Sequence, residues 1–357
     1  GAVNVVDNRI PANANENLTL IAVEASSAEN GQVVSVNKQL VSGERAFQFS
    51  ANFRSQTDYT VPEIESAEAH EGHGHKQENS DLTQQNINLG FAQHFDDGYF
   101  GFALSSMRHK FGLPGHEHAE EPSDPLDPLV EETEEEQARV DLQQLRLDSE
   151  AQWQLQAPLN TDFSWTQFEL KFSLVDYQHS EGHEEGHEEA DVIPVEDEHG
   201  HTGLTEFNRE ALASHMQVNY QAYQDHKGVI GVQLNRSMFS AHGGEAIVPE
   251  TQTDQVGLFA MHTWQFMPSV NFEAASRIES SAYQVETAEL DEAHLSECDL
   301  TKSDFSDRSY ETASLSSGLN IQLSPELTVR TNLTHVNRAP AIQELFSCGV
   351  HESSLTF

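Results

Sequence analysis

Histidines gather with carboxylates in a few glycine-containing stretches of this sequence. The chain contains 19 histidines. A neutral imidazole and a carboxylate together suit Zn²⁺, Cu²⁺ or Ni²⁺, and an unperturbed imidazole is mostly neutral at pH 7. We therefore expect these stretches to capture a divalent metal ion, although their spacing does not select among the metals. The histidines concerned are His70, His73, His75, His116, His118, His179, His183, His187, His199 and His201.

A solvated acidic tract with incidental histidines is the alternative interpretation of these stretches. A random composition would not confine so many histidines to a few segments, and this favours metal handling. His179, His183 and His187 would align on one face of a helix, but the intervening glycines favour a mobile loop.

The sequence lacks the residue patterns of the common enzyme classes. It has no Ser-His-Asp order, no phosphate-cradling glycine loop and no helical His-Glu-x-x-His motif. Two cysteines, Cys298 and Cys348, are too few for a zinc-finger framework. We therefore expect a protein that is not an enzyme and whose metal chemistry rests on His, Asp and Glu.

The composition argues against nucleic acid as a partner and against a helical membrane protein. With 59 acidic and 18 basic residues among 357, the formal net charge is −41, whereas a nucleic-acid-binding face must be basic. The mean hydropathy is −0.55, and no stretch approaches the roughly 18 apolar residues of a membrane helix. A helical membrane protein is excluded, but a transmembrane β-barrel is not, because its strands are apolar on one face only.

Alternation of apolar and polar residues predicts an all-β chain of about thirteen antiparallel strands. In 315–323, for example, Leu315, Leu319, Ile321 and Leu323 share one parity. A soluble sandwich would show the same alternation. The predicted strands are 18–28, 31–42, 46–59, 82–94, 98–109, 140–156, 162–177, 207–222, 228–239, 254–266, 270–281, 311–323 and 327–346.

The connections favour a transmembrane up-and-down β-barrel over a sandwich. After the first hairpin, short turns alternate with long connections, so every long loop would lie on one rim, as in outer-membrane barrels. The histidine tracts fall in these long loops. Trp153, Trp165 and Trp264 each lie near a short turn, as an aromatic belt at one membrane interface requires, although tryptophans of a sandwich core would be the alternative. The long loops are predicted at 60–81, 110–139, 178–206, 240–253 and 282–310.

Three local stretches resemble TonB-dependent outer-membrane receptors of Gram-negative bacteria. Gly-Ala-Val-Asn-Val-Val-Asp-Asn-Arg-Ile-Pro at 1–11 resembles the last strand of their plug domain. Phe-Gly-Leu-Pro-Gly-His at 111–116 is similar to the start of an extracellular loop. Arg-Ala-Pro-Ala-Ile-Gln-Glu-Leu-Phe at 338–346, followed by Gly-Val-His at 349–351, resembles a strand-and-loop signature midway through their barrels.

The resemblance implies a barrel of about 22 strands around a plug, located in the outer membrane and opened by a TonB-type energy-coupling complex. The chain is then an internal fragment, with the end of the plug at 1–12 and the N-terminal part of the barrel at 13–357. The histidine-rich loops, with Ser-Ala-His-Gly-Gly-Glu-Ala at 240–246, are similar to the zinc-uptake branch of the family. Zinc would then be the transported substrate rather than a resident cofactor.

An ordered metal site is expected at Glu245, His351 and His242 rather than in the richest histidine tracts. Ordering a glycine-rich loop costs about 1–2 kcal/mol per residue, whereas ligands next to strand ends lose less. Resemblance to the zinc receptors also points at Glu245 and His351, with partner ligands on the plug upstream of this chain. His242 is equally well interpreted as a loop cap.

The sequence leaves open two alternative functions and the pairing of the two cysteines. The protein could be a receptor for copper, nickel or a metal chelate such as a siderophore, or a secreted metal-sequestering β-protein. Cys298 and Cys348 both lie in long connections, which would face the oxidising exterior, and we predict a disulfide between them. The competing interpretation is a pair of unrelated thiols.

Overall fold

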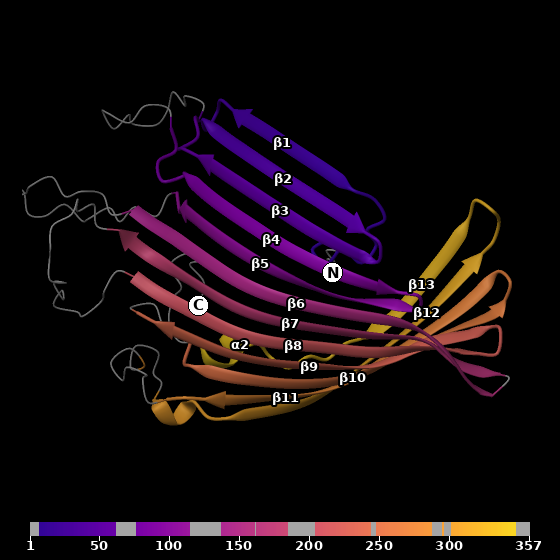
Figure 1. Cartoon of the computed structure of the whole chain (residues 1–357). Coiled ribbons are helices and arrows are strands. Elements are labelled where there is room, and N and C mark those ends of the chain that lie inside the picture. Colours follow the sequence, from indigo (N-terminus) through magenta and orange to yellow (C-terminus); the bar gives the residue numbers. More distant parts are fainter. Residues whose placement is uncertain are drawn as a thin grey trace, which may run out of the picture.

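The chain folds into one antiparallel sheet of thirteen strands that pair in sequence order (Figure 1). The computed structural model describes residues 7–61, 76–114, 137–160, 162–184, 204–243, 248–287, 295 and 301–347. The strands are β1 (Leu18–Ser26), β2 (Gly31–Ser42), β3 (Arg45–Gln56), β4 (Leu82–Phe95), β5 (Gly98–Gly112), β6 (Gln137–Asn160), β7 (Phe163–Glu184), β8 (Leu204–Ala222), β9 (His226–His242), β10 (Thr251–Met267), β11 (Val270–Val285), β12 (Arg308–Gln322) and β13 (Thr328–His335). This order confirms the predicted all-β, up-and-down architecture.

The sheet is open along its two outer strands. Within the described ranges, β1 pairs only with β2 and β13 pairs only with β12. The short turns that follow β2 lie together at one end of the strands, on the right of Figure 1, whereas the β1–β2 turn lies at the other end. The curved sheet is therefore consistent with part of a barrel wall.

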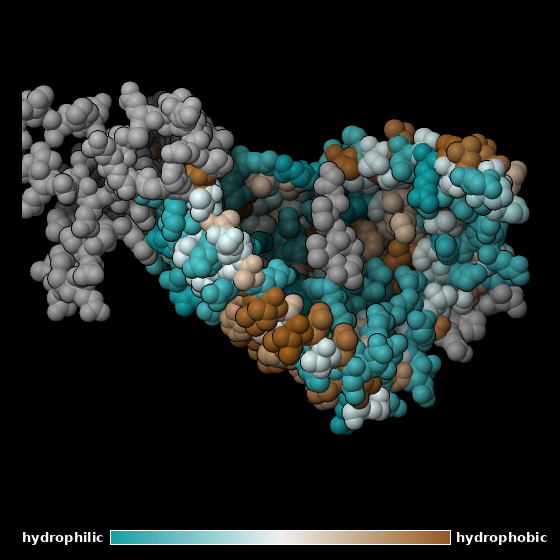
Figure 2. Space-filling view, turned by 90° about the horizontal axis from the view of Figure 1, so that it is seen from above, coloured by the Kyte–Doolittle hydropathy of each residue, from teal (hydrophilic) through white to brown (hydrophobic). Residues whose placement is uncertain are grey.

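The two faces of the sheet differ in polarity. One row of paired residues crosses neighbouring strands entirely with apolar side chains, each at least 36 % exposed. Large exposed apolar areas are unusual on soluble proteins and mark a surface that another apolar phase covers. In Figure 2 the hollowed side is mostly hydrophilic, and brown apolar residues gather on the outer wall. The row is Phe49, Leu89, Leu104, Leu147, Leu174 and Leu212.

The tryptophans lie in aromatic clusters next to the short turns. Trp165 meets Phe163 edge-on at 5.1 Å between ring centroids, and Trp264 meets Phe266 in the same way at 4.9 Å. Trp153 stacks on Phe168 at 6.1 Å. Such an arrangement fits the predicted aromatic belt at one membrane interface. Among the described helices, none has the length and apolar character needed to cross a membrane.

The strands β6, β7 and β8 extend further toward the long connections than predicted. Their pairing continues from Gln137↔Glu184 to Gly182↔Leu204, beyond the region of apolar alternation. Backbone hydrogen bonds to two neighbouring strands sustain these ends, and polar side chains do not interrupt them. The prediction that the loop begins at 178 is therefore wrong, because β7 continues to Glu184.

The last predicted strand, 327–346, is also wrong in its second half. The strand β13 ends at His335, and the short helix α2 spans Ile342–Phe346. Pro340 has no N–H to donate to a neighbouring strand, which disfavours continued pairing. The Glu344 carboxylate accepts the backbone N–H of Ala341 at 2.7 Å and so caps the first turn of the helix.

Candidate functional site

Most of the predicted metal ligands lie outside the described residues. This holds for both members of the proposed ordered pair and for most of the histidine tracts. Within the described ranges, no group of three His, Cys, Asp or Glu side chains is placed to hold a metal ion. The predicted residues outside these ranges are Glu245, His351, His70, His73, His75, His116, His118, His187, His199 and His201, together with Cys298 and Cys348.

His179 is part of a strand rather than of a mobile loop. It lies in β7, opposite Leu142 of β6 and Phe207 of β8. Its ring stacks on Phe207 with centroids 4.5 Å apart and planes 13° apart, and its Nε2 is 4.0 Å from Oε2 of Glu181. His183 also falls in β7. The first part of this histidine tract is therefore fixed by strand pairing, and Gly182 does not break the strand.

His242 is the last residue of β9 and stands opposite Glu206 of β8. Its neighbour Ala241 is opposite Phe207, which in turn stands opposite His179. Because successive residues of a strand point to opposite faces, His242 and His179 occupy opposite faces of the sheet. Gly243 follows at φ +128°, and a Cβ there would lie 2.4 Å from the carbonyl oxygen of Leu204. The chain therefore leaves β9 at a position that requires glycine.

A small apolar core joins several segments at the ends of the strands opposite the short turns. We call it the rim core, and its buried members are Val248, Tyr283, Leu295, Phe305, Ala339 and Phe346. Val248 is 4 % exposed, Leu295 is 2 % exposed and Phe346 is 3 % exposed. Apart from Tyr283, which is part of β11, the members belong to three different connections, after β9, between β11 and β12, and after β13. The rim core therefore fixes the relative positions of three segments that are distant in sequence.

Polar contacts hold the last of these segments in place. The Tyr283 hydroxyl donates to the carbonyl oxygen of Pro340 at 2.7 Å. Both ends of the Arg338 guanidinium donate to the Glu344 carboxylate, at 2.7 and 2.6 Å. Together with the Ala341 N–H, this guanidinium lowers the pKa of Glu344 to about 2. Glu344 is therefore ionised at neutral pH and anchors the chain that enters α2.

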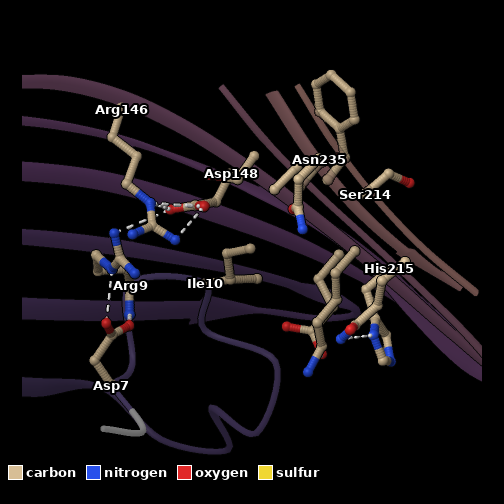
Figure 3. Close-up of a pocket in the computed structure, with 15 residues that line it drawn as sticks. Asp7, Arg9, Ile10, Arg146, Asp148, Ser214, His215 and Asn235 are labelled. Carbon is tan, nitrogen blue, oxygen red and sulfur yellow. Dashed lines mark hydrogen bonds and ion pairs between the residues drawn. The ribbon is translucent and has the colours of Figure 1, made fainter. Parts of the chain in front are cut away.

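The concave face of the sheet holds a polar cavity of about 470 Å³ (Figure 3). On one side, Asp148 forms ion pairs with Arg9, at 3.0 Å, and with Arg146, at 2.8 Å. On the other side, His215 has Gln233 Nε2 3.0 Å from its Nδ1 and Gln217 Oε1 3.0 Å from its Nε2. Figure 3 shows the two groups facing each other across Ile10. The lining offers both signs of charge and amide groups to a hydrated polar solute.

An up-and-down antiparallel sheet with an apolar outer face, a polar concave face and aromatic clusters at the short turns is the wall of an outer-membrane β-barrel. Residues 45–354 match the family described as TonB dependent receptor-like, beta-barrel, and the chain belongs to this family. Its members are outer-membrane proteins of Gram-negative bacteria.

Several solved structures share this fold. The copper transporter OprC superposes with a TM-score of 0.61 at 12% identity, over 91% of this chain and 45% of that one. The FrpB iron transporter from Neisseria meningitidis (F5-1 variant) superposes with a TM-score of 0.66 at 9% identity, over 93% of this chain and 48% of that one. This chain thus spans about half the length of these structures. A search of curated proteins gave no match.

Proposed function

We propose that the full-length protein imports zinc across the outer membrane, driven by a TonB-type complex that acts on a plug. Residues 1–12 would form the end of the plug, and 13–357 the N-terminal part of the barrel. Zinc is the substrate in this proposal, and the histidine tracts capture it outside the cell. Membership of the receptor family supports transport in general, and the imidazole and carboxylate tracts support a divalent metal.

The rim core carries the more specific part of the proposal. Val248 stands three residues after Glu245, and Phe346 stands five residues before His351. A chain covers at most about 3.6 Å per residue, so Glu245 lies within about 11 Å of Val248, and His351 within about 18 Å of Phe346. Both apolar residues are packed into one cluster. This common anchoring supports a site that takes a carboxylate and an imidazole from distant parts of the sequence.

Anchoring explains how a site here would bind and release the ion. Two ligands tethered to a packed cluster lose less conformational entropy on binding than ligands in a glycine-rich loop. Zinc prefers four ligands, so the remaining ones would come from the plug, with His242 as a third candidate in this chain. Movement of the plug would then remove part of the coordination sphere and release the ion, as transport requires.

A receptor for a metal chelate is the second candidate. The cavity of about 470 Å³ is far larger than a bare ion needs and falls within the usual range of small-molecule sites. Copper and nickel are further alternatives, since Cu²⁺ exceeds Zn²⁺ in affinity for most nitrogen and oxygen sites. A secreted metal-sequestering protein is disfavoured, because the outer face of the sheet is apolar.

Uptake measured in cells under zinc starvation tests the proposal. Cells with and without the full-length gene should differ in zinc uptake and zinc content, and not in the content of copper, nickel or chelated iron. We expect Glu245→Ala and His351→Ala to abolish high-affinity uptake, and deletion of 185–201 to lower capture only at scarce zinc. Equal loss from both kinds of change would place the site in the loops, and uptake of another metal alone would replace zinc as the substrate.

A further inference from the structure

The segment that precedes β1 lies on the concave face of the sheet and touches several strands. We call residues 7–17 the foot segment. Its backbone runs across two glycines, Gly90 of β4 and Gly101 of β5. A Cβ placed on Gly90 would stand 1.8 Å from the carbonyl oxygen of Arg9, and one placed on Gly101 would stand 2.4 Å from Cγ2 of Ile10. Only glycine permits this approach without displacing the foot segment.

The residues around the two glycines are also small and form a surface that fits the foot segment closely. We call this surface, made of Gly90, Ala92, Gly101 and Ala103, the seat. Ala92 and Ala103, their neighbours on the same face, are both 0 % exposed. Pro11 is among the most completely buried residues of the described chain. Glycine and alanine weaken a strand, because they lose more backbone freedom or pack less side chain than β-branched residues. Their gathering beneath Arg9, Ile10 and Pro11 therefore points to close packing with the foot segment.

Polar contacts attach the foot segment on both sides of this seat. Toward β2, Asn8 Nδ2 donates to Gln39 Oε1 at 3.1 Å, and Gln39 Nε2 donates to the Glu16 carbonyl oxygen at 2.8 Å. Toward β4, Nε2 of His94 is 2.7 Å from the carbonyl oxygen of Ala12.

An ion pair reaches a further strand. The Arg9 guanidinium stands 3.0 Å from Oδ2 of Asp148 in β6, and its side chain is 26% exposed. The contacts of the foot segment therefore extend from β2 to β6. A segment held by packing, hydrogen bonds and an ion pair on several strands cannot slide along the wall without breaking all of them together.

We propose that the foot segment is a fixed anchor, which keeps its place on the wall while the plug moves. The existence of a moving plug rests on the proposed transport function, whereas the attachment itself does not. In this arrangement a pull on the plug is resisted at Arg9–Pro11 and the plug remains tethered to the inside of the barrel.

A reversible cross-link tests whether the anchor stays in place during transport. Ile10→Cys combined with Gly101→Cys removes the methyl group that would lie 2.4 Å from the new Cβ and places two thiols side by side for a disulfide. The new Cβ also comes within 2.8 Å of the Phe91 carbonyl oxygen, so formation of the cross-link is verified by mass spectrometry before uptake is measured. Cys298 and Cys348 are replaced by serine in every strain. We expect uptake by the full-length receptor to be the same in the oxidised and reduced double variant. Loss of uptake on oxidation, with recovery on reduction, would overturn the proposal.

A second measurement does not depend on the identity of the substrate. Gly90→Ala should displace the foot segment and loosen the plug, so that cells become several-fold more susceptible to vancomycin, which is too large for intact outer membranes. Gly318→Ala is the matched control, because the close contact of a Cβ there is with the flexible Asn332 amide, at 2.7 Å, and Glu273 lies at an ordinary contact distance of 3.7 Å. Unchanged susceptibility of the Gly90→Ala strain at normal receptor levels would contradict the claim that the seat holds the foot segment in place. If the parent receptor imports no zinc, the proposed function fails, and this measurement still decides the anchor.

Discussion

Arg338 and Glu344, six positions apart in sequence, form a bidentate ion pair at the first turn of α2. The same carboxylate accepts the N–H of Ala341, so the pair and the helix cap are one unit. The helix in turn carries Phe346, which is buried in the rim core. An exposed ion pair is thereby coupled to the packing that gathers the segments next to Glu245 and His351.

This coupling predicts a pH-dependent loosening of α2. The pKa of Glu344 is lowered from 4.5 to about 2, first by the Arg338 hydrogen bonds and then by the Ala341 N–H. A lowered folded-state pKa stabilises the folded state above the ordinary pKa, and this contribution is lost as the pH falls through 4.5 toward 2. A spin label at the exposed Gln343 should therefore become more mobile in this window. Glu344→Gln should abolish the transition, and an identical titration in both proteins would contradict the prediction.

The extended strand β7 predicts that the boundary of a loop deletion decides whether the barrel assembles. Removal of 185–201 leaves β7 intact, whereas removal of 179–201 deletes the residues that pair with Gln137–Leu142 and with Leu204–Phe207. We expect the first variant to show the heat-dependent gel mobility of a folded barrel at parental levels, and the second to be depleted from the outer membrane. Equal amounts of folded barrel in both variants would mean that these pairings are dispensable.

The rim core also bears on the two cysteines. Cys298 stands three residues after Leu295, and Cys348 stands two residues after Phe346, and both apolar residues belong to the rim core. At no more than about 3.6 Å per residue, the cysteines are tethered within about 11 and 7 Å of these anchors. We therefore predict a disulfide, seen as a joined pair of peptides by mass spectrometry without reduction. Alkylation of both thiols in unreduced protein from the outer membrane would contradict it.

The strands were predictable because each one exposes apolar side chains to lipid on one face only. Alternations such as Leu315 to Leu323 are a local signal, and local signals survive in a single sequence. The ends of β7 were not predictable, because His179 and Glu181 are held by strand pairing to β6 and β8, which leaves no apolar pattern.

The seat of the foot segment is a different case. Gly90 and Gly101 look like weak strand positions in the sequence, and their use becomes visible only when Arg9 and Ile10 are placed against them. The Arg9–Asp148 ion pair likewise joins residues 139 positions apart, and no spacing rule links them. The candidate metal ligands Glu245 and His351 were predicted from their positions next to strand ends and from resemblance, and both lie outside the described residues.

The alternation of short and long connections predicts which rim faces the cell exterior. Both rims carry glutamates, so a glutamate-specific protease could cleave either rim. Added to intact cells, it therefore reports which rim is exposed at the cell surface. Glu44 and Glu326 are exposed in short turns, whereas the acidic tracts at 115–136 and 185–203 belong to the long connections. Short turns of outer-membrane barrels face the periplasm, so we expect cleavage only in the long connections of intact cells. Cells with a permeabilised outer membrane should add cleavage at Glu44 and Glu326. Cleavage confined to these two glutamates in intact cells would reverse the orientation and would place the histidine tracts on the periplasmic side, where they could not capture metal from outside.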